Sequence, residues 1–160
     1  MAQRPTVDWN KLPAATKILL VAGLLYFIDL FLPWYKYNAH IPTVSGWHGA
    51  LGILCGLVVI LILLMETLTV MNVPVNIGTD VMRKQVEAGA AGLLLLLTIL
   101  HVFIKPGTGG IPFLHVGWEP WAWIGLIISI VVAYGGYMRW QEASVTPAAP
   151  GQAGGGGFAP

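Results

Sequence analysis

Asp29 and His101 are ionisable side chains embedded in long apolar stretches of this chain. Ionisable groups inside a membrane are often functional, because placing them there is energetically costly. A carboxylate and an imidazole at matching depths could relay a proton or hold a metal ion. Alternatively, they reach the outer interface or bind each other as packing contacts. The sequence favours this second interpretation, because Asp29 lies roughly 18 Å along a helix from Lys17, away from the membrane midplane.

His115 and Glu119 form a His-x-x-x-Glu pair, a spacing that puts two zinc or copper ligands on one face of a helix. Pro120 works against a continuous helix at this place. An enzyme with an external metal site would need these two residues and either His40 or His48. No second strong ligand pair is visible, so we expect no bound metal.

Other sequence patterns typical of enzymes are missing. There is no Ser, His and Asp order, no paired-carboxylate motif, no phosphate-binding glycine loop and no His-Glu-x-x-His. The single cysteine, Cys55, excludes an internal disulfide framework. A net charge of +1 provides no basic surface for nucleic acid. We therefore expect no enzymatic activity, no cofactor and no nucleic-acid partner.

The composition places the chain in a bilayer. Hydrophobic residues make up 56% of the 160 residues and charged residues only 9%, against about 25% charged in soluble domains. A helix needs roughly 20 mainly apolar residues to cross a membrane. The sequence predicts an all-α membrane protein, a bundle of four transmembrane helices in two tandem hairpins, with spans at about 15–34, 47–70, 85–104 and 120–138.

These spans form a transmembrane domain at 15–140. Residues 1–14 are expected to be a cytoplasmic or interfacial segment. Residues 141–160 end in TPAAPGQAGGGGFAP. This composition offers little apolar mass to bury, which predicts a disordered tail.

Lysine and arginine predict the orientation, because they remain on the cytoplasmic side of short loops. Lys36 and Lys105 fall on one side of the predicted spans. The remaining basic residues fall on the other side: Arg4, Lys11, Lys17, Arg83, Lys84 and Arg139. We therefore expect a multi-pass protein of the cell membrane with both termini in the cytoplasm. The tryptophans agree, since all lie at predicted boundaries, where their rings favour the headgroup level: Trp9 and Trp140 inside, Trp34, Trp47, Trp118, Trp121 and Trp123 outside.

The two halves of the chain share a weak similarity. DLFLP at 29–33 resembles HVFIKP at 101–106, and IPTVSGWHGALGIL at 41–54 resembles IPFLHVGWEPWAWIGL at 111–126. Each half would be a helical hairpin with an Ile-Pro and Gly-Trp outer loop. Both hairpins start inside, so the repeat is of the parallel kind. This alignment gives Asp29 and His101 equivalent positions.

Small residues indicate where helices approach, because lipid provides no hydrophobic force between them. Gly52 and Gly56 have GxxxG spacing, and Gly125, Ser129 and Ala133 share one helical face. These faces could close a four-helix bundle or bind the span of a partner or of a second copy.

Two carboxylates flank the inner loop. Glu66 is expected at the inner surface, paired with Arg83 or Lys84 or in contact with water. Glu87 opens the third span, where its negative charge suits the N-terminus of a helix.

The segment VDWNKLPAATKILLVAGLLYFIDLFLPWY, followed by SGWHG and a Pro/Gly-rich end, resembles a group of small four-span membrane proteins of actinobacterial type, a group of uncharacterised function. The likeness covers the first half best, through DWNKL, FLPWY and SGW. LPW at 32–34 and EPW at 119–121 are also similar to the bacterial SPW repeat proteins, although the serine of that motif is absent here. Neither resemblance implies catalytic residues.

The sequence thus predicts an integral membrane protein that acts as a non-enzymatic structural or interaction component. Its expected partners are the lipid bilayer and a membrane protein or a second copy of the chain. The alternative is a small proton- or metal-ion-handling protein that uses Asp29 and His101.

Overall fold

The computed structural model describes residues 9–38, 43–71, 73, 79–105 and 115–145. Within these residues the elements follow in the order η1 (Trp9–Lys11), α1 (Ala14–Asp29), β1 (Pro33–Tyr37), β2 (Val44–Ser45), α2 (Gly49–Val70), α3 (Asp80–Phe103), β3 (Val116–Trp118) and α4 (Pro120–Ser144). The predicted N-terminal segment lies outside the described residues up to residue 8, and so does the predicted tail from residue 146.

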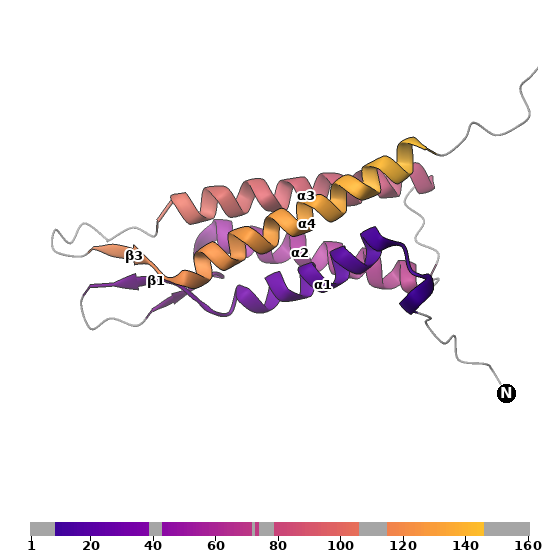
Figure 1. The fold of residues 1–160 in the computed structure, drawn as a ribbon. Helices are drawn as coiled ribbons and strands as arrows, with labels where there is room; N and C mark the ends of the chain where they lie inside the picture. Colours follow the sequence, from indigo (N-terminus) through magenta and orange to yellow (C-terminus); the bar gives the residue numbers. More distant parts are fainter. Residues whose placement is uncertain (1–8, 39–42, 72, 74–78, 106–114, 146–160) are drawn as a thin grey trace, which may run out of the picture.

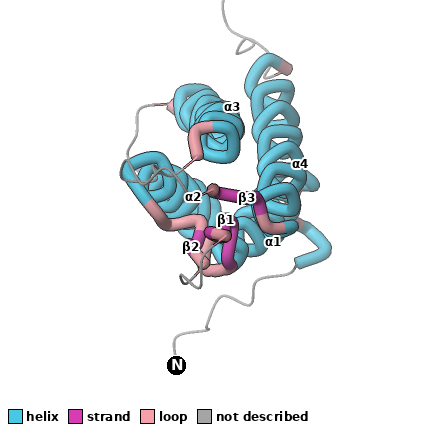
Figure 2. The backbone as a smooth tube through the Cα atoms, turned by 90° about the vertical axis from the view of Figure 1, so that its left-hand side faces the viewer, coloured by secondary structure: helices cyan, strands magenta, loops and turns pink. Residues whose placement is uncertain are grey.

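The helices lie side by side around a common centre (Figure 1, Figure 2). Both α1 and α3 pack against α2 and α4. At one end, here called the terminal end, α1 and α3 begin and α2 and α4 end. The three strands lie at the opposite end, here called the sheet end.

Among the described residues, three helices, α2, α3 and α4, are long and apolar enough to cross a membrane. Large apolar side chains on them are exposed, including Leu57 at 57% and Ile127 at 62%. Such an exterior suits contact with the apolar lipid chains. The helical backbone is also compatible with lipid, because its polar groups are hydrogen-bonded within each helix. The protein therefore has the character of a multi-pass membrane protein. α1 has only 16 residues, about 24 Å at ~1.5 Å per residue, so a fourth helical span is not shown.

The first predicted span, 15–34, is not helical over its full length. α1 stops at Asp29, and the chain turns at Leu30 before entering β1 at Pro33. Proline lacks a backbone N–H and disfavours helical geometry at the residue before it. α1 therefore ends five residues before the predicted end at 34, more than one helical turn.

The other helices follow the sequence more closely. α3 begins at Asp80, before the predicted 85, because the Thr79 hydroxyl caps it by accepting a hydrogen bond from the Met82 backbone N–H at 3.3 Å. α4 begins at Pro120 as predicted and continues to Ser144, past the predicted 138. Residues 141–144, predicted as the start of the disordered tail, are therefore helical.

A three-stranded antiparallel sheet joins the loops at the sheet end, in the order β2-β1-β3. The expectation of an all-α protein was incomplete in this respect. Tyr35 of β1 is paired with Trp118 of β3. The register with β2 shifts between Pro33 and Tyr35, and this irregularity interrupts side-chain alternation. As a result, consecutive residues Trp34 and Tyr35 are both fully buried.

The glycines of the GxxxG pattern accommodate a loop side chain. A Cβ on Gly56 would collide with the Trp47 ring, and a Cβ on Gly52 would meet the backbone of Trp47. At Gly125 a Cβ would collide with the Asp29 carboxylate and the Trp34 ring. These small residues therefore make room for the chain at the sheet end.

The remaining members of the predicted packing face differ in burial. Ser129 is fully buried and its hydroxyl donates to the Leu126 backbone oxygen at 2.7 Å, whereas Ala133 is half-buried. The close approach of α4 to α3 occurs further along, at Gly136, where a Cβ would lie 2.5 Å from the Ala91 Cβ.

Gly136→Ala should therefore lower the melting temperature, and Gly92→Ala should not. Overpacking costs about 1–3 kcal/mol, whereas a Cβ at Gly92 meets nothing within 4 Å. Both changes gain the same helix propensity of roughly 0.5–1 kcal/mol, so their difference reports packing alone. Thermal unfolding in detergent, followed by circular dichroism, measures both. Equal melting temperatures would contradict the close approach of α3 and α4.

Candidate functional site

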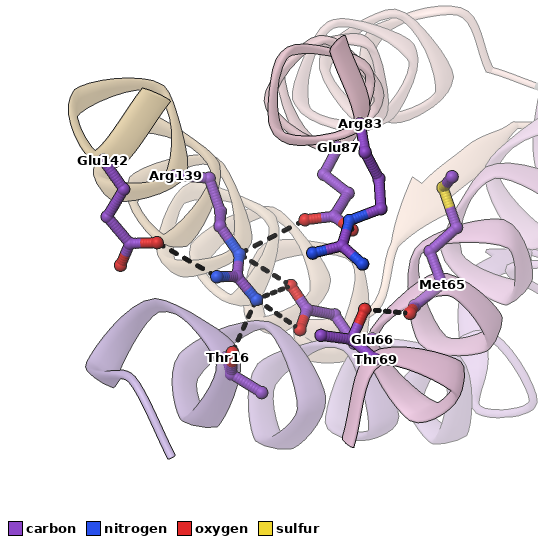
Figure 3. Close-up of polar contacts among 8 residues, drawn as sticks. All are labelled: Thr16, Met65, Glu66, Thr69, Arg83, Glu87, Arg139 and Glu142. Carbon is purple, nitrogen blue, oxygen red and sulfur yellow. Dashed lines mark hydrogen bonds and ion pairs between the residues drawn. The ribbon is translucent and has the colours of Figure 1, made fainter. Parts of the chain in front are cut away.

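A buried ion network lies near the terminal end and receives side chains from every helix (Figure 3). Arg139 of α4 is 3% exposed, and Glu66 of α2 and Glu87 of α3 are fully buried. Thr16 of α1 is also buried. Charged side chains are almost never buried to this degree unless they are paired, so these groups depend on one another.

Arg139 is the centre of this network. Its Nε donates to Glu66 Oε1 at 3.1 Å, and its Nη2 donates to Glu66 Oε2 at 2.7 Å. Nη2 also donates to the Thr16 hydroxyl at 2.5 Å. Nη1 donates to Glu142 Oε2 at 3.0 Å. The planar guanidinium thus forms a two-pronged contact with one carboxylate, the strongest geometry for such a pair.

Glu87 approaches the network from α3. Its Oε2 lies 3.2 Å from Arg139 Nε, and its Oε1 lies 3.8 Å from Arg83 Nε. The expectation that Glu66 would pair with Arg83 or Lys84 at the surface was wrong, because Glu66 is fully buried and bound to Arg139. The expectation that Glu87 opens the third helix was wrong, because α3 begins at Asp80. Glu87 lies about two turns inside the helix and is buried.

Asp29 and Trp34 form the second polar cluster, at the sheet end. The Trp34 indole N–H lies 3.0 Å from Asp29 Oδ2 and 3.1 Å from the Asp29 backbone oxygen. The chain after α1 thus folds back on the last residue of that helix. Trp34 was predicted as an interfacial anchor, but it is fully buried inside the protein.

His101 lies against the same tryptophan, with ring centroids 5.1 Å apart. Its Nε2 is 3.0 Å from the Gly46 backbone oxygen. A carbonyl oxygen only accepts, so this nitrogen carries the hydrogen. The His101 backbone oxygen accepts a hydrogen bond from the Tyr35 hydroxyl. Asp29 and His101 therefore share Trp34 as a neighbour, and each hydrogen-bonds to a different group.

An open cavity of about 260 Å³ adjoins His101, between the start of α2 and the end of α3. His48 and Lys105 also line it. Lys105 donates to the Val116 backbone oxygen at 3.1 Å and lies over the Trp118 ring.

The external metal candidates are not gathered around one point. Glu119 forms an ion pair with Lys36 at 3.0 Å. The exposed His115 donates its backbone N–H to Asn38 Oδ1 at 2.9 Å. His40 lies outside the described residues. Within the part of the chain that the structure describes, no three His, Cys, Asp or Glu side chains are grouped as a metal site would require.

The charge distribution predicts only that Arg139 lies on the cytoplasmic side and does not predict its burial. Its spacing carried a further signal: Val132, Gly135, Gly136 and Arg139 recur at helical intervals and are buried together. An arginine that continues a buried stripe points inward, and it then requires a buried carboxylate.

No family model, curated protein or solved structure matches this chain.

Tyr35→Phe should weaken the alkaline loss of stability. Burial raises the pKa of Tyr35 to about 12, above about 10 in an unfolded chain. The folded state holds this proton more tightly, so the stabilisation is complete below pH ~10 and is lost as the pH rises through about 12. Melting temperatures across this range should fall less steeply in the variant than in the parent. Tyr37→Phe, on the same strand, is the control, and an unchanged slope in Tyr35→Phe would contradict the assignment.

Proposed function

We propose that this protein is a non-enzymatic structural or interaction component of the cell membrane. It has four transmembrane helices, both termini in the cytoplasm and the sheet outside. One observation carries the proposal: buried polar side chains bind groups on other elements. Arg139 of α4 hydrogen-bonds to Glu66 of α2 and Thr16 of α1, and its Nε lies 3.2 Å from the Glu87 carboxylate of α3. Contacts of this kind stabilise the arrangement of the helices. They also engage polar side chains that a catalytic or ion-binding site would need to leave available.

The outer surface of the sheet is the proposed recognition surface. Trp34 and Tyr35 of β1 are fully buried and anchor the sheet to the helices. Next to them in the same strand, the Lys36 side chain is 58% exposed and pairs with Glu119. A rigid surface loses little entropy when it binds a partner. A membrane protein with an outer domain, or a second copy of this chain, would fit.

The predicted internal repeat fits a structural component built from two hairpins. In each aligned segment a strand lies at a Gly-Trp pair. β2 comes directly before Gly46 and Trp47, and β3 ends in Gly117 and Trp118. Both strands flank β1 in the sheet. A duplicated hairpin with one added strand accounts for this arrangement.

Ion handling at Asp29 and His101 is the second candidate. Asp29 Oδ1 favours it, because this buried oxygen has no hydrogen-bond partner within the described residues. The effect of Asp29→Asn distinguishes the two functions. Ion handling requires that this variant no longer moves ions while its fold stays intact.

Cysteine-directed crosslinking tests the main proposal. Cys55 is the chain's single cysteine, so Cys55→Ala provides a background for Lys36→Cys on the sheet and Gln141→Cys near the terminal end. A membrane-impermeant maleimide with a photoreactive group is applied to intact cells. Lys36→Cys should be labelled and, on illumination, form one discrete adduct with a protein that mass spectrometry identifies. Gln141→Cys should react only after permeabilisation.

The outcomes separate the two parts of the proposal. Labelling of Gln141→Cys alone in intact cells would reverse the orientation. A labelled Lys36→Cys that yields only lipid adducts would contradict the interaction role. Loss of the exposed Lys36 ion pair should not affect folding, because surface pairs contribute about 0–1 kcal/mol.

A further inference from the structure

The buried ion network contains more acidic than basic groups. The charged neighbours of Glu87 are Glu66 from α2, Arg83 from its own helix, and Arg139 and Glu142 from α4, while Thr16 from α1 contacts Arg139. If every one of these ionisable groups is charged, three carboxylates face two guanidiniums. Arg83 and Glu142 lie towards the edge, with side chains 18% and 32% exposed. The central group of Arg139, Glu66 and Glu87 then carries one uncompensated negative charge.

The hydrogen bonds of Arg139 show which of the two central carboxylates, Glu66 or Glu87, is its ionised partner. Arg139 has one hydrogen on Nε and two on Nη2. These are directed to Glu66 and Thr16. The Glu66 carboxylate accepts from Arg139 at both oxygens, and hydrogen bonds to an ionised group favour its ionised form. Glu66 is therefore the charged partner of Arg139.

Glu87 has no comparable support. It is fully buried, and among the described residues neither of its carboxylate oxygens has a hydrogen-bond partner. Oε2 lies near Arg139 Nε, but that N–H is directed to Glu66. Arg83 Nε is 3.8 Å from Oε1, beyond hydrogen-bond distance. An ionised carboxylate in such a place is costly, and proteins commonly remove the cost by neutralising the group.

We propose that Glu87 is a proton-binding site enclosed by the four helices near the terminal end. This site goes beyond the proposed function, does not depend on it, and is separate from Asp29 and His101 at the sheet end. With the proton bound, Glu87 is neutral and the Arg139–Glu66 pair is balanced. When the O–H bond breaks, the electron pair stays on the carboxylate and the proton passes to water at the partly exposed edge beside Arg83. The carboxylate then competes with Glu66 for Arg139.

The ligand is a proton and not a metal cation. A metal cation needs several ligands, and the groups beside Glu87 are the guanidiniums of Arg139 and Arg83, which have no acceptor atom to offer one. The Glu66 oxygens are occupied by Arg139. A single proton neutralises the carboxylate and needs no further ligands.

Infrared spectroscopy of the full chain in lipid nanodiscs tests the site. At pH 7 exposed carboxyl groups are ionised, so a protonated carboxyl C=O band reports a buried acid. The parent protein should show this band, and Glu87→Gln should lose it. Glu142→Gln is the matched control in the same network and should retain the band. A band that survives Glu87→Gln but disappears in Asp29→Asn would assign the proton to Asp29 and overturn the proposal, as would the absence of any band in the parent.

Melting temperatures provide an independent readout. Glutamine imitates a neutral glutamate, so Glu87→Gln should melt at or above the parent temperature at pH 7. Glu66→Gln should melt lower, because it leaves Arg139 without its charged partner. Failure of Glu87→Gln to fold, or a loss equal to that of Glu66→Gln, would show that Glu87 is required in its ionised form and would overturn the site.

Discussion

The paired contact of Arg139 with Glu66 is the interaction on which the helical arrangement depends. It joins α4 to α2, and the same guanidinium reaches α1 through Thr16 and α3 through Glu87. In lipid there is no hydrophobic force to bring helices together, so packing and polar contacts select their neighbours. Removing one partner of a buried pair costs about 3–5 kcal/mol, although an apolar replacement of the whole pair is often tolerated. The contact therefore specifies an arrangement more than it adds stability.

Trp34 has the corresponding role at the sheet end. Its indole N–H satisfies Asp29, its ring packs on His101, and Gly125 provides the space beside it. One large side chain thereby connects α1, α3 and α4 beneath the sheet. Between the two ends, the Tyr26 hydroxyl lies 2.7 Å from the Thr98 hydroxyl and links α1 to α3. The helices are thus joined by polar contacts at three levels.

This distribution separates the surface from the interior. Apolar side chains such as Ile127 face outward, and the charged side chains of Glu66, Glu87 and Arg139 are buried between the helices. The pattern is suited to a membrane, where the exterior needs no polar groups and the interior can satisfy them. In the proposed structural role, the protein would present its sheet at one end, while the ion network lies at the opposite end. Recognition and proton binding would therefore use separate ends of one molecule.

The sequence by itself determined the membrane class, three long apolar helices and the start of α4 at Pro120, because hydropathy, length and proline act within one segment. It did not determine the sheet, since β2 has only two residues and strands this short depend on pairing with distant ones. It placed Trp34 and Glu66 at membrane surfaces, and the tertiary structure buried both. Arg139 and Glu66 are separated by 73 residues, and no local pattern selects a partner at that distance. Only the packing of α4 against its neighbours brings the two charges together, and the cost of leaving either one unpaired in the interior determines that they bind.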